Sequence, residues 1–273
     1  MSKMVKKEKD DIFKYRSLKK VLVFVLVVFL LLIISVFINL FYIAKDSKYN
    51  GRDQYTVSVI ATTDKSSVIF FNPENKSISH VIMNGDRKNI SPGRLLGVLI
   101  DSNINLNEDL KSYSVSQILL KAFIHPGNRK QNITAIDIVR LFMFSRSLSA
   151  SGFNEESINL SSSNYRLGNI ERLLMDMNII KERKSIEIVN GTNVSGLGKR
   201  LETVLKNIGC NVVAVNASIE EVEKSEIIVT DNDSYTLKKL QRNLRYPIKI
   251  TDNHDIADIK IVIGSNGVRD NVF

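Results

Sequence analysis

The chain has 273 residues, one cysteine and a formal net charge of +9 at pH 7. A single cysteine excludes an intrachain disulfide, and residues 1–20, with eight basic and three acidic side chains, account for +5 of that charge. The other +4 is spread over residues 21–273, which is too mild and scattered to indicate nucleic-acid binding.

Residues 21–44 contain no charged side chain and are flanked by lysines. A helix of this length reaches ~36 Å, enough to cross the ~30 Å hydrocarbon core of a bilayer. We therefore predict a cytoplasmic basic tail at 1–20, a transmembrane helix at 21–44 and a linker at 45–54. Basic residues beside a spanning helix stay in the cytoplasm, so residues 45–273 are expected outside. A cleaved signal peptide is the alternative reading, but its apolar core would be shorter and would end in a small-x-small pattern.

The next segment, 55–180, is predicted to be an α/β domain. Alternating apolar residues predict strands at 55–61, 68–71 and 78–83. Apolar runs behind capping residues predict helices at 91–100, 114–124, 134–144 and 169–177. The Asn-Pro turn at 72–76 joins two of the strands as a hairpin, and the serine-rich stretch 159–164 is predicted to be a loop.

The last segment, 185–266, has the clearest pattern and is followed by a tail at 267–273. Strands are predicted at 185–190, 211–215, 226–230 and 259–264, with a short extra one at 248–250. Helices with one apolar stripe are predicted at 194–208 and 234–244. This order, β-α-β-β-α-β, predicts a two-layer sandwich in which both helices cover one face of a sheet. The fold class is therefore α/β, of the α+β sandwich type, in two outer units.

This last segment also resembles a known family. The run 186–200 reads Ile-Glu-Ile-Val-Asn-Gly-Thr-Asn-Val-Ser-Gly-Leu-Gly-Lys-Arg, which is similar to the opening of the LytR C-terminal domain. The run 257–264, Ala-Asp-Ile-Lys-Ile-Val-Ile-Gly, is similar to the closing strand of that domain. The resemblance implies a bacterial cell-envelope protein, related to the LytR-CpsA-Psr proteins, and gives a compartment more than a reaction.

A shorter likeness lies in the hairpin segment, which resembles the LytR-CpsA-Psr catalytic domain. There a strand, an Asn-Pro turn and a second strand end in Ile-Pro-Arg-Asp. Here Asp86 falls at the Asp, Gly85 takes the place of the Arg, and Arg87 follows. In that family the Arg belongs to a set that holds a lipid pyrophosphate, and no later Arg-x-Arg cluster occurs here. A divergent phosphotransferase would need Asp86, Arg87 and either Arg140 or Arg146 in one cavity.

Two further groups are candidate binding residues. The turn residues Asn190, Gly191, Thr192 and Gly196 precede a helix and are expected either to shape a tight turn or to form a weak anion site. A basic face on the second helix of the last segment is expected to point outward, either merely solvated or in contact with anionic wall polymers such as teichoic-type phosphates. Its members are Lys238, Lys239, Arg242 and Arg245.

The sequence predicts neither a cofactor nor a metal. The glycine spacing at 191–198 differs from a dinucleotide fingerprint, so a nucleotide cofactor is not expected. The three histidines, His80, His125 and His254, are far apart and lack ligand partners at regular spacing. Cys210 is predicted to be a buried, inert thiol.

These patterns favour a single-pass protein of the bacterial cell membrane without a catalytic centre. Its expected partners are the lipid bilayer and an anionic cell-wall polymer or another envelope protein, and no nucleic acid. The alternatives are the phosphotransferase described above, which would attach lipid-linked glycopolymer to the cell wall, and a protein–protein scaffold.

Overall fold

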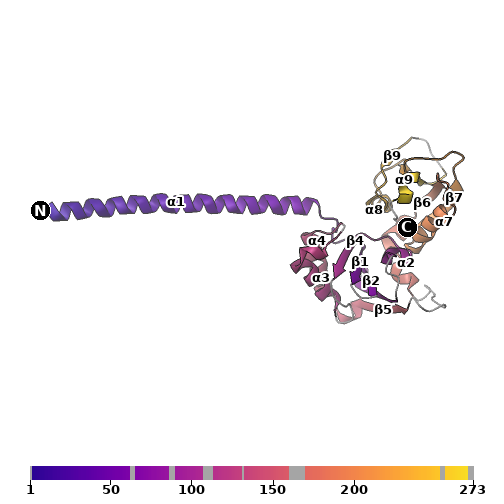
Figure 1. Cartoon of the computed structure of the whole chain (residues 1–273), viewed down its shortest axis with the longest axis horizontal. Helices are drawn as coiled ribbons and strands as arrows, with labels where there is room; N and C mark the ends of the chain where they lie inside the picture. Colours follow the sequence, from indigo (N-terminus) through magenta and orange to yellow (C-terminus); the bar gives the residue numbers. More distant parts are fainter. Residues whose placement is uncertain are drawn as a thin grey trace. The chain divides into compact units, whose positions relative to one another are not determined.

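The computed structural model describes residues 2–61, 65–85, 90–106, 113–130, 132–159, 170–252 and 256–269. The chain divides into two compact units, residues 1–47 and 48–273, and each is described by itself. Figure 1 shows a helix in the first unit and a mixture of helices and strands in the second.

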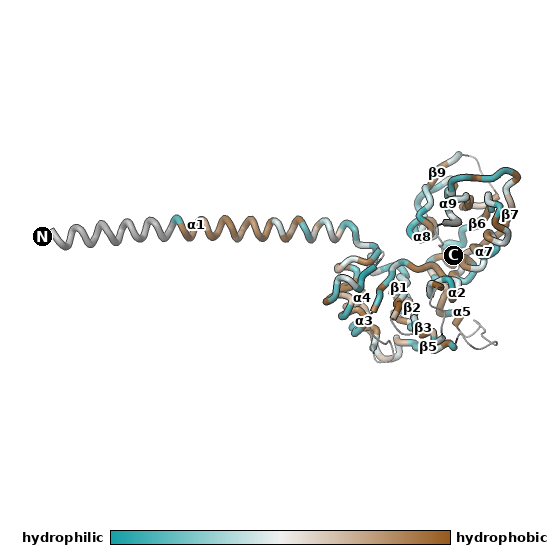
Figure 2. Tube along the Cα trace, viewed as in Figure 1, coloured by the Kyte–Doolittle hydropathy of each residue, from teal (hydrophilic) through white to brown (hydrophobic). Residues whose placement is uncertain are grey.

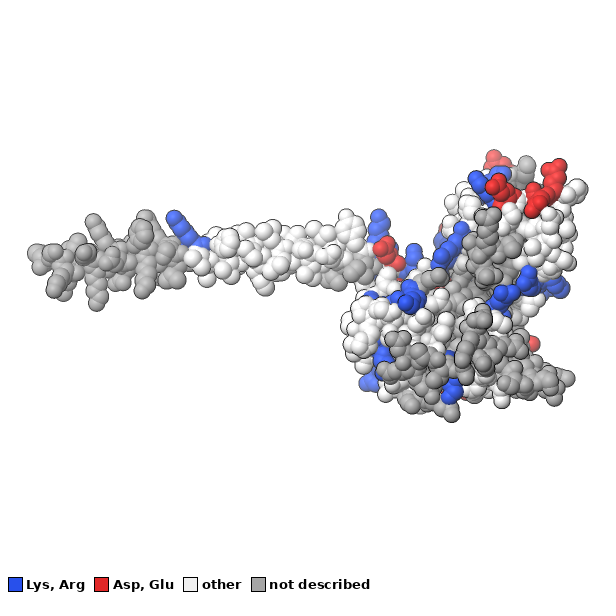
Figure 3. Space-filling view, viewed as in Figure 1, with Lys and Arg blue, Asp and Glu red and all other residues white. Residues whose placement is uncertain are grey.

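The first unit is the helix α1, Ser2–Lys45. Within it, Lys20–Asn39 is the one helical stretch of the described residues that is long and apolar enough to cross a membrane. Figure 2 shows this stretch as mostly hydrophobic, and in Figure 3 basic side chains lie toward both of its ends. Apolar side chains are exposed on every face of it, as suits a helix in lipid. The structure therefore confirms the predicted apolar helix as a candidate membrane span.

The first sheet of residues 48–273 has five strands. They are β1 (Tyr55–Ala61), β2 (Lys65–Asn72), β3 (Ser77–Asn84), β4 (Ser102–Leu106) and β5 (Phe153–Asn159). Their order is β4-β1-β2-β3-β5, with β1, β2 and β3 antiparallel and both edge strands parallel to their neighbours. The three predicted strands and the hairpin are confirmed. The hairpin turn forms because the Asn72 side chain accepts a hydrogen bond from the Asn75 amide at 3.1 Å.

Five helices connect the strands of this sheet or follow them in the chain. They are α2 (Pro92–Leu96), α3 (Val115–Ile124), α4 (Ala135–Ser147), α5 (Glu171–Leu174) and α6 (Met177–Glu182), with 3₁₀ turns at Pro126–Asn128 and Ala150–Gly152. The capping boxes predicted at Ser114 and Thr134 are both present. The helix predicted at 91–100 ends early, because Gly97 takes a left-handed conformation with φ 62° after one turn. The loop predicted at 159–164 lies almost entirely outside the described residues.

The second sheet also has five strands. Its elements are β6 (Ser185–Asn190), α7 (Leu197–Asn207), β7 (Asn211–Ala217), β8 (Glu226–Val229), α8 (Tyr235–Leu244), β9 (Ile248–Ile250) and β10 (Ile259–Ile263). Their spatial order is β7-β6-β10-β8-β9. The predicted order of elements is confirmed, with β9 as the added edge strand. The predicted tail at 267–273 instead begins within a short helix, α9 (Ser265–Arg269).

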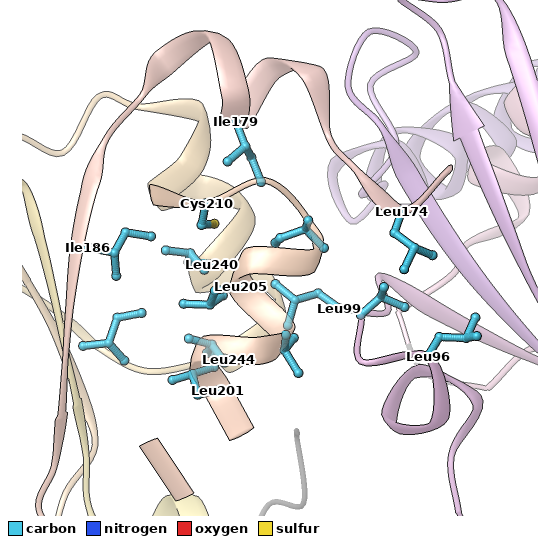
Figure 4. Packing of buried hydrophobic residues seen from close by; sticks show 14 of the residues in the cluster. Leu96, Leu99, Leu174, Ile179, Ile186, Leu201, Leu205, Cys210, Leu240 and Leu244 are labelled. Atoms are coloured by element: carbon cyan, nitrogen blue, oxygen red, sulfur yellow. The ribbon is translucent and has the colours of Figure 1, made fainter. Parts of the chain in front are cut away.

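One hydrophobic core joins the two sheets. Leu201 and Leu205 of α7 and Leu240 of α8 pack on the face of the second sheet that carries Ile186. Figure 4 shows Leu96, Leu99 and Leu174, from the segment before the second sheet, next to the same helices. The cluster reaches the first sheet through buried residues of β2 and β3. The second sheet and its helices are thus packed against the first sheet within one unit, which is why a site can form between them.

A second cluster covers the opposite face of the first sheet. Alternate residues of β1, Tyr55, Val57 and Val59, are fully buried beneath Ile118 of α3 and Leu141 of α4. The other residues of β1 therefore face the second sheet and its helices. This alternation places Thr56 and Ser58 at the junction of the two sheets.

Candidate functional site

A buried carboxylate, Asp101, lies at the junction between the two sheets. It immediately precedes β4, and its side chain is fully buried. Its oxygens accept hydrogen bonds from Lys239 Nζ at 2.7 Å, Arg242 Nε at 2.8 Å and Asn243 Nδ2 at 3.1 Å, all from α8. The backbone N–H of Thr56 on β1 donates a fourth, at 2.8 Å. A single carboxylate therefore connects the first sheet to the helix of the second.

The charges of this cluster do not balance, because two cations share one carboxylate. Burial alone would raise the pKa of the Asp101 carboxyl, but Lys239 and Arg242 outweigh it and hold that pKa below its usual range. Lys239 Nζ also donates to the Gln54 carbonyl at 2.9 Å, which holds it inside the junction. The guanidinium of Arg242 remains partly exposed, at 18% for its side chain, beside a cavity.

The predicted outward basic face on α8 is wrong for two of its four members. Lys239 is buried, and Arg242 is mostly buried, because the first sheet covers that side of α8. Lys238 and Arg245 are exposed as predicted. The sequence contained one signal of this contact: Lys239, Arg242 and Asn243 follow the three- and four-residue spacing that places side chains on one helix face. The acidic partner was missed because it lies 138 residues from Lys239 in the sequence.

A cavity of about 430 Å³ opens beside the Asp101 cluster. The first sheet and its connections contribute Ser58, Arg94 and Asn132 to its lining, and α8 and its end contribute Asn243 and Arg245. A second cavity of about 600 Å³ adjoins it, because both are lined by Asn132, Arg242 and Arg245. We call the two together the basic groove.

The lining of the basic groove is strongly cationic. It contains five basic side chains, namely Lys48, Arg94, Lys238, Arg242 and Arg245. Asp101 is the one carboxylate among its described lining residues, and Arg242 and Lys239 already neutralise it. Lys238 pairs with Asp233 at 2.6 Å, whereas no carboxylate among the described residues pairs with Arg94 or Arg245. Guanidinium groups suit phosphate and carboxylate oxygens. The groove can therefore attract and hold an anion.

The turn before α7 is held by hydrogen bonds among its own residues. Asn190 Oδ1 accepts from the amide and the hydroxyl of Thr192, at 3.1 and 2.8 Å, and Asn190 Nδ2 donates to the Val194 carbonyl. Gly196 is the N-cap of α7, with φ 77° and no side-chain cap. These contacts support the structural reading of Asn190, Gly191, Thr192 and Gly196 over the anion-site reading.

Gly191 and Gly264, from the motifs at the two ends of the last segment, both pack against the connection between β7 and β8. An added Cβ at Gly191 would lie 2.6 Å from the Val222 side chain, and one at Gly264 would lie 2.6 Å from the backbone of Lys224. The Val222 amide donates to the Gly191 carbonyl at 2.7 Å. Since β6 and β10 are parallel neighbours, both glycines follow strand ends at one edge of the sheet. The connection from β7 to β8 crosses that edge so closely that a side chain at Gly191 or Gly264 would clash with it.

The residues proposed for phosphotransfer do not form a described site. Asp86 and Arg87 lie outside the residues that the structure describes. Arg140 donates to the Tyr49 carbonyl at 2.7 Å, and Arg146 is exposed on the last turn of α4. Neither arginine lines the basic groove. The structure therefore gives no support to an anion site built from Arg140 and Arg146 together.

The other titratable candidates are isolated. The described part of the chain contains no group of three His, Cys, Asp or Glu side chains that could hold a metal, and His254 lies outside it. His80 is buried on β3, and this burial lowers its pKa although Glu155 partly opposes the shift. Cys210 is buried as predicted, and desolvation raises the pKa of its thiol to about 12. The absence of a cofactor and of a metal stays a prediction.

Residues 183–266 match the family model LytR_C, described as LytR cell envelope-related transcriptional attenuator. The predicted LytR C-terminal domain is thus confirmed, and it corresponds to the second sheet with α7 and α8. Comparisons with curated proteins and with solved structures find no match. The match includes α8, so this domain contributes one wall of the basic groove, and the segment before it contributes the other.

Proposed function

We propose that this LytR C-terminal domain protein is anchored in the bacterial cell membrane and holds an anionic envelope polymer in its basic groove without reacting with it. The domain relates the chain to the cell envelope, and the apolar stretch Lys20–Asn39 supplies the anchor. The basic residues before this stretch support a cytoplasmic N-terminus, which leaves residues 45–273 outside.

The observation that carries the binding proposal is the charge of the groove. Of its five basic side chains, Lys238 pairs with Asp233 and Arg242 pairs with Asp101. The other three, Lys48, Arg94 and Arg245, have no carboxylate partner among the described residues. Envelope polymers of the teichoic type present phosphates at regular intervals, and a row of cations can contact several at once. Each exposed contact contributes little, roughly 0.5–1 kcal/mol, so affinity would depend on their number and would fall with added salt.

Binding of a polyanion is testable with the full chain in nanodiscs and a poly(glycerol phosphate). The double variant Lys48→Gln and Arg245→Gln is expected to weaken binding by about tenfold at low salt, because two exposed charge contacts are lost. The matched control is Arg200→Gln with Lys249→Gln, two exposed basic residues outside the groove. Equal losses in both double variants, or no binding by the unaltered chain, would contradict the proposal.

Anchoring and orientation are testable in cells. The full chain is expected in the membrane fraction after alkaline carbonate washing, because the apolar stretch is embedded in lipid. Protease added to intact protoplasts is expected to digest residues 45–273 and to leave the N-terminal tail protected. A chain starting at residue 48 and kept in the cytoplasm serves as the soluble control. Protection of the distal part in intact protoplasts would reverse the proposed orientation.

A further inference from the structure

We propose that the 430 Å³ cavity of the basic groove is a subsite for one phosphorylated polyol or sugar unit, with arginines on the phosphate and buried polar atoms on the hydroxyls. This rests on the proposed function and deepens it, because it names the chemical unit that the groove recognises. The cavity is within the size range of sites for small ligands, ~300–1,000 Å³.

Two buried polar atoms in the cavity wall lack hydrogen-bond partners in the described structure. They are Ser58 Oγ, on a residue only 1% exposed, and Asn243 Oδ1, on a residue 9% exposed. Buried polar atoms are nearly always paired with protein, water or a ligand. Ser58 points away from the α3 and α4 side of its strand, and Asn243 is fixed by its donation to Asp101 at 3.1 Å. Both side chains therefore lie in the cavity wall with hydrogen-bonding capacity that no described protein group fills.

The types of these atoms limit the ligand. Asn243 Oδ1 can only accept a hydrogen bond, so its partner must carry an O–H or N–H group, which a fully ionised phosphate lacks. A serine hydroxyl can donate or accept, as suits a neighbouring alcohol. Arg94 and Arg245 line the same cavity and favour a phosphate group. A ligand that satisfies all four residues carries both a phosphate and hydroxyl groups.

Other anionic ligands fit the lining less well. A nucleotide base would need a face to stack on, and no aromatic side chain occurs among the described residues that line this cavity. The first sheet forms a polar floor, because Ser58 pairs with Asn103 across β1 and β4 and both line the cavity. Adjacent hydroxyls of a polyol or sugar match such a floor.

The test uses calorimetry on the full chain in nanodiscs with glycerol 3-phosphate, inorganic phosphate and glycerol as probes. Glycerol 3-phosphate is expected to bind at least tenfold more tightly than phosphate, with no measurable binding of glycerol. Ser58→Ala is expected to weaken glycerol 3-phosphate binding about fivefold and to leave phosphate binding unchanged, because it removes only the hydroxyl contact. Arg94→Gln is expected to weaken both anions about tenfold.

Ser67→Ala is the matched control for Ser58→Ala. Ser67 is equally buried, its Oγ also lacks a partner in the described structure, and it does not line the cavity. The subsite is overturned if inorganic phosphate binds as tightly as glycerol 3-phosphate, or if the two serine variants behave alike. Polymer binding that depends on Lys48 and Arg245 but not on Ser58 would retain the proposed function and reject the subsite.

Discussion

Replacing Asp101 by alanine is expected to lower the free energy of unfolding by about 3–5 kcal/mol, because the change leaves a buried ammonium without its counter-charge. Lys239 is 3% exposed and would keep only its bond to the Gln54 carbonyl. The loss can be measured by guanidinium unfolding of the full chain in detergent, followed by circular dichroism. Adding Lys239→Met to Asp101→Ala is expected to restore part of the stability, because the second substitution removes the orphaned charge.

The matched control for this prediction is Asp233→Ala, just before the N-cap of α8. Asp233 pairs with Lys238 at 2.6 Å, about as closely as Asp101 pairs with Lys239. The side chains of Asp233 and Lys238, however, are both exposed. Exposed pairs contribute at most about 1 kcal/mol, so this variant should unfold almost like the unaltered chain. Similar losses in the two aspartate variants would show that the junction does not depend on a desolvated ion pair.

The same carboxylate gives the stability a pH dependence of known sign. The pKa of Asp101 is lower in the folded protein than in the unfolded chain, so the unfolded chain takes up its proton first as pH falls. Its contribution is complete above the ordinary carboxyl pKa of about 3.9 and disappears as pH falls through the lower folded value. The Asp101→Ala variant should therefore lose less stability than the unaltered chain over this acidic range.

The second large effect is expected from Gly264→Ala, which should destabilise the protein by about 3 kcal/mol. The added methyl group would lie 2.6 Å from the backbone carbon of Lys224, and backbone cannot rotate away as a flexible side chain can. Thermal unfolding of the full chain measures this loss.

Gly127→Ala is the control for this steric argument. No atom lies within 4 Å of a Cβ at Gly127, and its backbone φ is not positive, so the substitution should change stability by less than about 0.5 kcal/mol. If Gly264→Ala proves equally mild, the connection from β7 to β8 does not pack on the strand end as described.

Local patterns in the sequence were enough to predict most of the framework. Tyr55, Val57 and Val59 alternate because one face of β1 is buried, and the α7 stripe appears because one side of that helix meets a sheet. The missed strand β4 shows this contrast over only five residues, with Ile104 and Leu106 buried, and β5 lacks it. Asn103 and Asn105 are half-buried in β4, and in β5 only Ile158 is buried. Their strand structure depends on pairing with β1 and β3, which no local pattern records.

The site was less predictable than the fold, for a related reason. Helical spacing identified α8 but could not tell that two of its faces are covered, since the second covering element is more than a hundred residues away. Lys239 therefore looked like a surface lysine. The glycine motif left two readings open, a tight turn or a weak anion site, and did not reveal that Gly191 leaves room for Val222.

The single thiol of this chain also makes it convenient for probe attachment. Cys210 is 6% exposed and its pKa is raised to about 12, so at neutral pH it presents almost no thiolate to a maleimide reagent. A second cysteine introduced on either side of α1 could then be labelled selectively without first mutating the natural one. Membrane-impermeant fluorophores, spin labels or crosslinkers could in this way report the sidedness of the helix and the occupancy of the groove in one native background.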